Sequence, residues 1–218
     1  MNELHTLELF KELDAAFEKS DIKQLAKAKS CDWNYSLTST PLYENSLLLV
    51  GFNPGAKRDY HYSKQSSLPN ENFILQDLGS FRRIVPFLKK FYPDETIDKI
   101  VQINYCFFRS SMESEISPKD KMLCEPIFFK LLSILKPRQI ISFSASLRQH
   151  LLKHKELFTV RFDNRIQSNK GMINTVVGEL KINSCIIPIG FLPHPNYPLI
   201  GSARENAWKT VIENINSL

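Results

Sequence analysis

The hydrophobic residues of this chain fall in short runs that are separated by amphipathic stretches. Runs at residues 46–51 (SLLLVG) and 139–144 (QIISFS) are too short for helices and predict buried strands. Residues 99–108 (KIVQINYCFF) predict another strand, which ends near Asn104. Residues 175–192 (TVVGELKINSCIIPIGFL) predict two extended segments around a KINS turn. The strands are thus short, apolar and bounded by polar residues.

Between these runs, apolar residues recur every three to four positions, as on one face of a helix. Helices are predicted at residues 3–18, 21–29, 79–91, 117–135, 144–154 and 202–215. Asp21 and Ser117 are the expected caps of the second and fourth helices. Pro86 is expected to bend the third helix, and Pro126 either bends the fourth or marks its true start.

The alternation of strands with helices predicts the fold class. It favours an α/β three-layer sandwich, in which helices flank a central, mainly parallel four-stranded sheet. The 218 residues fit a single domain, 1–218, on which residues 1–45 pack as a helical N-terminal extension. Residues 54–72 are polar and rich in turn formers, which predicts a long loop.

Composition changes this picture only slightly. The net charge of +5 and the pI of about 8.9 permit a polyanionic partner without requiring one. The N-terminal stretch is charged and helix-like, so we expect no signal peptide, and no apolar stretch reaches the length of a membrane span. The four scattered cysteines contain no C-x-x-C pair and fit reduced thiols. We therefore expect a cytoplasmic protein with no membrane partner.

Three polar clusters follow predicted strands: GFNPG at residues 51–55, NYCFFRS at residues 104–110 and PHPNYP at residues 193–198. In α/β folds, ligands bind beyond the carboxyl ends of the parallel strands. We therefore expect the three clusters to meet at one edge of the sheet and to form a single site.

Asn53 is held between residues that restrict or relax the backbone in a defined way. Pro54 keeps Asn53 extended, while Gly51 and Gly55 permit close approach of the chain. The result is a stiff turn that can aim a carboxamide into a cleft, where it positions a water or a polar ligand edge. The same N-P-G sequence is also common turn chemistry, in which Asn53 bonds only to the backbone.

Two further side chains in these clusters can bind a flat polar ligand. His194 lies between two prolines after a strand, so its imidazole is pre-set to donate a hydrogen bond to developing negative charge. The alternative is a loop histidine with no role. Asn104 has the donors and the acceptor that reading one edge of a nucleobase requires. Its alternative role is to satisfy loop backbone at the strand end.

Aromatic and basic residues near the clusters are candidates for nucleic-acid contacts. Tyr60, Tyr62 and Phe73 lie in or beside the long loop, where a ring either stacks on a flat ligand or packs the loop down. For the two tyrosines we favour packing. The basic residues beside the clusters, which are suited to phosphate contacts, are Lys57, Arg58, Arg109 and Arg204.

In this order, the three clusters resemble motifs of the uracil-DNA glycosylase superfamily. GFNPG is similar to the first motif, in the asparagine form of the single-strand-selective monofunctional and mismatch-specific branches. NYCFF is similar to the strand-end segment with the base-reading asparagine, and HPNYP to the second motif, usually H-P-S-P. The segment 124–152 and the helix with Trp208 are also similar to the family. The resemblance spans residues 46–216.

The resemblance implies the superfamily's α/β fold and a monofunctional DNA glycosylase, which hydrolyses the N-glycosidic bond of uracil or a related damaged base in DNA. Asn53 would position the attacking water. His194 would hydrogen-bond uracil O2 as the leaving group gains charge. Asn104 would read the pyrimidine edge, and Phe73 would stack on the base.

The resemblance also implies the surroundings of the extruded base. The backbone of Gly51 and Phe52 would line the pocket, and Tyr197 or Leu199 would fill the gap in the base stack. This chemistry requires neither a metal nor a lysine nucleophile. We expect no metal and no cofactor, and a monomer whose partner is DNA containing a damaged base.

The sequence departs from the family in several places. The first motif lacks the aspartate of the most active branch, which predicts slower chemistry. Asn196 and Tyr197 replace the usual Ser-Pro, and the loop after residue 55 is polar instead of small and apolar. Cys106 and Cys124 resemble two ligands of the iron–sulfur branches, whose N-terminal C-x-x-C is absent, since only Cys31 is present there.

Two alternatives to the glycosylase stay open. One is a superfamily member that binds nucleic acid or a nucleotide without releasing a base. The other is a flavodoxin-like protein that shares the motifs by chance, for which GFNPGAKRDY is a poor phosphate-binding loop.

Overall fold

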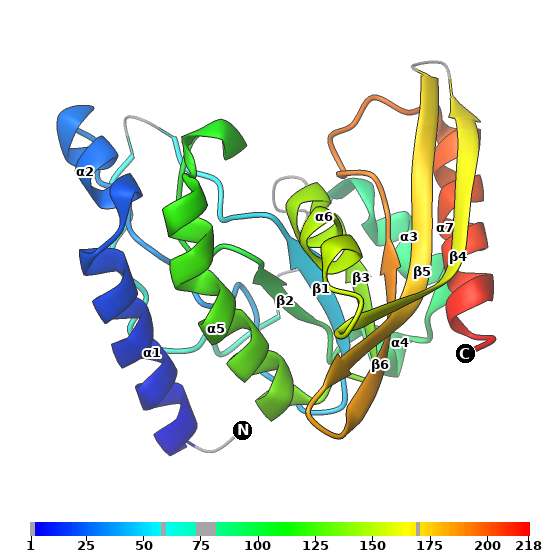
Figure 1. The fold of residues 1–218 in the computed structure, drawn as a ribbon, viewed down its shortest axis with the longest axis horizontal. Coiled ribbons are helices and arrows are strands. Elements are labelled where there is room, and N and C mark those ends of the chain that lie inside the picture. Colours follow the sequence, from blue (N-terminus) through cyan, green and yellow to red (C-terminus); the bar gives the residue numbers. More distant parts are fainter. Residues whose placement is uncertain (1–2, 58–59, 73–81, 169–170) are drawn as a thin grey trace.

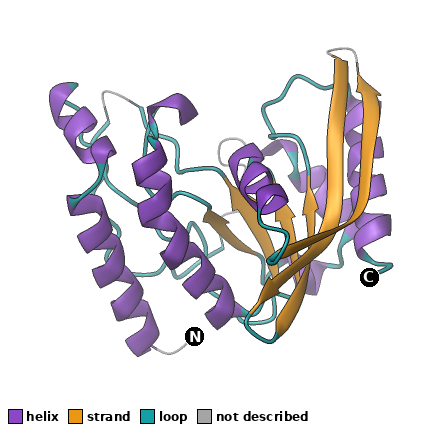
Figure 2. Cartoon of the chain, in the orientation of Figure 1, coloured by secondary structure: helices purple, strands orange, loops and turns teal. Residues whose placement is uncertain are grey.

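The computed structural model describes residues 3–57, 60–72, 82–168 and 171–218 (Figures 1 and 2). The α-helices are α1 (Glu3–Glu18), α2 (Asp21–Ala28), α3 (Val85–Phe91), α4 (Asp94–Ile97), α5 (Pro118–Leu135), α6 (Ala145–Lys153) and α7 (Gly201–Ile215). The strands are β1 (Leu47–Gly51), β2 (Val101–Asn104), β3 (Gln139–Ser142), β4 (Phe158–Ser168), β5 (Gly171–Ile182) and β6 (Cys185–Phe191).

These strands form one six-stranded sheet in the order β2-β1-β3-β6-β5-β4. β2, β1, β3 and β6 are parallel, whereas β5 and β4 are antiparallel to their neighbours. The prediction of a four-stranded sheet is therefore wrong, although four adjacent parallel strands do form one part of it. β4 escapes a sequence pattern because its residues are largely polar and a β-bulge between Val160 and Phe162 interrupts its alternation.

Helices cover both faces of the sheet, which confirms the α/β class (Figure 1). Leu48 and Val50 of β1 belong to one core, together with residues of α1, α5 and α6. Leu47 and Leu49 belong to a second core, with α3, α4 and α7. β1 reads as a continuous apolar run because both of its faces are buried. Within the described ranges, every helix is too short or too polar to cross a lipid bilayer.

The N-terminal segment packs on α5 and then returns to the sheet. The Asp120 carboxylate of α5 accepts a 2.8 Å hydrogen bond from the Asp21 backbone N–H. Farther on, Thr38 Oγ1 donates to the Gln102 carbonyl at 3.0 Å, and the Gln102 N–H donates to Thr40 Oγ1 at 2.9 Å. These bonds cover the outer edge of β2, which would otherwise present unpaired backbone groups.

The start of α5 agrees with its capping sequence. Ser117 Oγ accepts from the Asp120 N–H at 3.1 Å, and the Asp120 side chain accepts from the Ser117 N–H at 2.9 Å. This reciprocal pair satisfies two free donors of the first turn. The helix continues through Pro126, so the alternative start at Pro126 is wrong.

Two other helix boundaries differ from the sequence prediction. Ser20, and not Asp21, caps α2, because its Oγ accepts from the Lys23 N–H at 3.2 Å. α3 begins at Val85 with Pro86 in its first turn, so this proline starts the helix instead of bending it. Residues 79–81 of the predicted helix lie outside the described residues.

Candidate functional site

The carboxyl ends of the four parallel strands lie together at one edge of the sheet. Gly51 at the end of β1 is paired with Asn104 at the end of β2. On the other side of β1, Val50 pairs with Ser142, and Ser142 pairs with Phe191 at the end of β6. The three polar clusters therefore leave the sheet at this edge. We call it the rim, formed by residues 51–55, 104–116 and 192–200.

The Asn104 carboxamide lies directly beside Gly51. Asn104 exposes 7% of its surface, and a Cβ atom on Gly51 would come within 2.4 Å of Asn104 Oδ1. A side chain at position 51 would therefore displace the Asn104 carboxamide. Among the described residues, no hydrogen-bond partner of the Asn104 carboxamide is found, so its donors and its acceptor are available to a ligand.

The nitrogen of the Asn53 carboxamide is fully engaged by the protein. Nδ2 donates to Ser110 Oγ at 2.8 Å, to the Phe108 carbonyl at 3.2 Å and to the Pro54 carbonyl at 3.3 Å. These bonds orient the amide, while Oδ1 forms no hydrogen bond within the described part of the chain. An amide held in this way can accept a hydrogen bond from a water and fix its position, but it is no general base.

His194 is oriented by the backbone of its own loop. Its Nδ1 accepts a 3.1 Å hydrogen bond from the Asn196 N–H, which places the proton of the neutral ring on Nε2. Desolvation lowers the pKa of His194 below its usual 6.5, the Arg204 cation lowers it further, and Glu113 opposes both. At neutral pH, the ring is therefore an uncharged Nε2–H donor with solvent on one side.

The loop at 192–200 is fixed to α7 by a buried cation. Arg204 is 9% exposed and donates from Nη2 to the Tyr197 carbonyl at 2.6 Å. The Tyr197 N–H in turn donates to the His194 carbonyl at 2.8 Å, and the Leu199 N–H to the Tyr197 carbonyl at 2.8 Å. Tyr197 and Ile200 expose 38% and 50% of their surface, so both can reach a partner, and the sequence analysis did not select Ile200.

Arg109 and Lys57 differ in how far they are available. Arg109 donates from Nη1 to the Gly55 carbonyl at 3.2 Å, and its guanidinium lies 4.7 Å from the centre of the Tyr62 ring. Burial lowers its pKa. Lys57 is exposed, and its backbone N–H donates to the Tyr62 hydroxyl at 2.9 Å, so Tyr62 packs the loop down as expected.

The remaining predicted site residues are either buried or outside the described ranges. Phe52 is 6% exposed, with Lys121 Nζ of α5 at 5.3 Å from its ring centre, so only its backbone can face a ligand at the rim. Phe73 and Arg58 lie outside the described residues. Phosphate contacts by the basic residues stay a prediction, and the burial of Arg204 points instead to a structural role in the loop.

Several residues of the rim have no motif that would have selected them. Ser110 accepts a hydrogen bond from Asn53, the charge of Glu113 raises the pKa of His194, and Lys121 places a cation above the ring of Phe52. Only the strand-end position of NYCFFRS pointed near Ser110 and Glu113.

The buried thiols do not form a metal site with other residues of the described ranges. Cys106 and Cys124 are fully buried, with Sγ atoms 3.6 Å apart. Burial raises the pKa of the Cys106 thiol, and the neighbouring Cys124 raises it further. In those ranges, no group of three or more His, Cys, Asp or Glu side chains could hold a metal ion.

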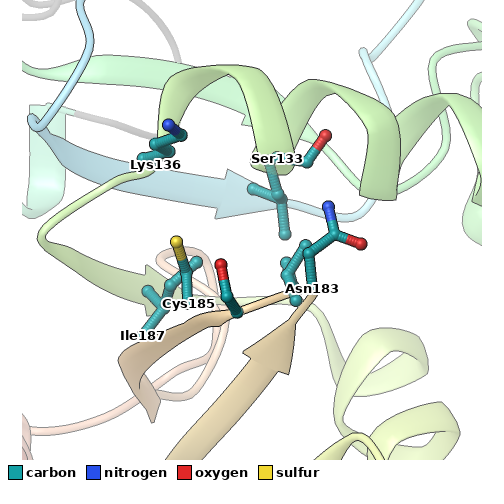
Figure 3. A pocket seen from close by; sticks show the side chains of 8 residues that line it. Ser133, Lys136, Asn183, Cys185 and Ile187 are labelled. Atoms are coloured by element: carbon teal, nitrogen blue, oxygen red, sulfur yellow. The ribbon is translucent and has the colours of Figure 1, made fainter.

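A separate pocket lies at the edge of the sheet opposite the rim (Figure 3). It is formed by the C-terminal end of α5 and the turn between β5 and β6, and Lys136, Asn183 and Cys185 lie on its wall. β6 begins here and ends at the rim, so this pocket is not part of the candidate site.

Comparison with known proteins adds no assignment. No protein-family model matches the chain, and no curated protein matches its sequence.

Proposed function

We propose that the protein is a monofunctional DNA glycosylase, which hydrolyses the N-glycosidic bond of uracil or a related damaged base in DNA. The observation that carries the proposal is the Asn104 carboxamide, which is buried beside Gly51 at the end of a parallel strand and has no hydrogen-bond partner among the described residues. Such an amide suits one edge of a pyrimidine, which offers a donor and an acceptor side by side.

The rim supplies two further groups that the reaction requires. When the bond to the sugar breaks, negative charge develops on the base, and His194 Nε2–H can donate to the base oxygen that receives it. One such donor contributes about 10²–10³ in rate. The Asn53 carboxamide, held through its nitrogen by Ser110, can direct a water toward the sugar carbon through Oδ1.

Substrate access requires that the nucleotide leave the base stack. This costs a few kcal/mol in a duplex and less for a mismatched or single-stranded base. Tyr197 and Ile200 are exposed on the loop beside His194 and are suited to fill the resulting gap. The order of the three motifs supports the same proposal. The proposal includes a location in the cytoplasm, where DNA can be repaired.

The test is incubation with oligonucleotides that carry a single uracil, hypoxanthine or hydroxymethyluracil, followed by alkaline cleavage. We expect base release without strand scission before the alkali is added. Asn53→Ala and His194→Ala should each lower the release about 10²-fold or more, with near-native circular dichroism. DNA binding without release of any of these bases would favour the alternative of a binding module, and full activity in both variants would refute the assigned roles.

A further inference from the structure

Gln102 shares one face of β2 with Asn104, because side chains two positions apart in a strand point to the same side. Their neighbours on β1 are Leu49 and Gly51. A Cβ atom on Gly51 would lie 2.4 Å from Asn104 Oδ1 and 3.9 Å from Gln102 Nε2. Both carboxamides therefore border the space that the missing side chain of Gly51 leaves open.

The carboxamide oxygen of Gln102 accepts no hydrogen bond from the described residues. Gln102 exposes 2% of its surface, and its Nε2 donates to the Ile103 carbonyl at 2.9 Å. A carbonyl only accepts, so this bond fixes which end of the amide is nitrogen. The other end, Oε1, is buried and has no hydrogen-bond partner among the described residues. Buried polar groups are normally paired, so we expect a hydrogen-bond donor to approach this oxygen in some state of the protein.

The backbone of Gln102 is held firmly. Its N–H donates to Thr40 Oγ1 at 2.9 Å, and its carbonyl accepts from Thr38 Oγ1 at 3.0 Å and from the Ser39 N–H at 3.2 Å. These bonds fix the backbone of Gln102 inside the sheet, so the unpaired Oε1 stays away from solvent. Asn104 is a donor on this face of β2, and no partner of its two N–H groups is found in the described part of the chain.

We propose that Gln102 is the positioning residue that sets the base specificity of this site: when a base enters, its Oε1 accepts one N–H of Asn104 and fixes the direction of that carboxamide. This inference rests on the proposed function. The bond leaves Asn104 with Oδ1 and one N–H toward the base, in a fixed order. The structure does not contain this bond, so a rotation of the Asn104 side chain is needed to form it.

The fixed order distinguishes two bases of equal size. Uracil presents an N3–H donor beside an O4 acceptor, which matches an acceptor and a donor on Asn104. Cytosine presents an N3 acceptor beside an N4–H donor and needs the amide turned around. The turned amide would place Asn104 Oδ1 against Gln102 Oε1, and two acceptors in contact repel each other. Gln102 therefore excludes cytosine, the most abundant base that resembles uracil.

The test compares wild type with Gln102→Leu, which removes the acceptor and leaves a slightly shorter apolar side chain. Gln139→Leu is the matched control, because Gln139 is also buried on a parallel strand and bonds to the Tyr92 hydroxyl at 2.9 Å, away from the rim. Release of uracil and of cytosine from otherwise identical oligonucleotides is measured for each protein, together with competition by the two free bases.

We expect Gln102→Leu to lower the preference for uracil over cytosine about tenfold, which is the effect of one hydrogen bond to a fixed amide. Gln139→Leu should leave that preference unchanged. An unchanged ratio in Gln102→Leu, with uracil still released, overturns the role of Gln102 and leaves the proposed function standing. If wild type neither releases uracil nor binds the free base, both fail.

A second measurement does not depend on the variant's folding. In ¹⁵N–¹H spectra of the wild-type protein, free uracil should move one Asn104 amide proton downfield, as a new hydrogen bond requires, and should shift the Gln102 amide signals with it. Free cytosine should produce neither change. Movement of the Asn104 signal alone, with Gln102 unaffected, would refute the proposed bond. Gln102→Met serves as a second substitution if the leucine variant does not fold.

Discussion

Arg204 donates a 2.6 Å hydrogen bond to the carbonyl of Tyr197, and this bond joins helix α7 to the loop that carries His194. The guanidinium is buried, so the bond is protected from competition with water. Because the Tyr197 N–H donates to the His194 carbonyl, the position of the imidazole depends on a residue ten positions farther along the chain. The loop at residues 192–200 is thus held by a helix that packs beside it.

Replacing the buried guanidinium should loosen this loop. We expect Arg204→Met to lower the free energy of unfolding by about 1.5–3 kcal/mol, as for a lost hydrogen bond to a charged group. Base release should fall further than the remaining fraction of folded protein explains. Thermal denaturation, uracil release and amide exchange across residues 193–200 measure the three effects. Lys209→Met, at an exposed position of the same helix, is the control and should change none of them.

The anchor of Asn53 can be tested separately. Ser110→Ala removes the shortest of the three bonds to Asn53 Nδ2, at 2.8 Å. The amide should then sample other directions, and the rate of base release should fall about tenfold for the loss of one such bond. Ser111→Ala removes a hydroxyl that bonds to Glu115 and should have no comparable effect. Equal rates for the two variants would mean that the direction of Asn53 is unimportant.

The pH dependence of base release should follow the charge of His194. Its pKa lies below 6.5 because the loop desolvates it. Release should hold constant above pH 6.5 and fall only as the pH drops through the lowered pKa. Protonation of Nδ1 would set two donors against each other, since the Asn196 N–H already points at that atom. Rates measured from pH 4.5 to pH 8 on a uracil oligonucleotide give the midpoint, and a midpoint above 6.5 would contradict this account.

Stability should change over the same pH range in a fixed direction. The unfolded chain binds a proton at His194 near pH 6.5, whereas the folded protein binds it only at lower pH. Acid therefore favours unfolding, and the loss grows from pH 6.5 down to the folded pKa and then stops. Comparing urea unfolding of wild type and His194→Gln at several pH values isolates this contribution, which the variant should lack.

A side chain at position 51 should displace the Asn104 carboxamide. In Gly51→Ala the new Cβ would stand 2.4 Å from Asn104 Oδ1, so the carboxamide must move. We expect a loss of about 1–3 kcal/mol in the free energy of unfolding, as for other overpacked sites, and loss of uracil binding. Gly55→Ala is the matched control, because a Cβ there meets no atom within 4 Å. Similar behaviour of the two variants would show that the Asn104 position is not constrained.

The position of the rim could be predicted because short apolar runs followed by polar residues mark buried strands and their ends. β1, β2 and β3 are short, apolar and buried on both faces, and each is followed by polar residues at the edge where parallel strands end. β4 could not be predicted because it is a largely polar edge strand with a bulge. β4 adds to the sheet beyond β5, at the side farthest from β2, so the four parallel strands stay adjacent.

Partners of the site residues were harder to foresee than the residues themselves. Arg204 stands beside a polar cluster in the sequence and resembles a surface cation, but the turn of α7 buries it under the loop. In the sequence, Gln102 is a polar residue within an apolar strand. Its proposed role depends on Gly51 of the adjacent strand, which has no side chain to fill the space beside Gln102. Gln102 and Gly51 lie about 50 positions apart in the sequence, so no local pattern contains their pairing.

The cover of β2 by residues 38–40 has a practical consequence for anyone shortening this chain. A version that starts at β1 would lack the hydrogen bonds of Thr38 and Thr40 to the Gln102 backbone. It would also expose the edge of β2, which could then pair with a strand of a second molecule. Its failure to bind a base would then say nothing about the chemistry at the rim. Residues 38–40 therefore support the proposed ligand site through the backbone of Gln102, without themselves belonging to the rim.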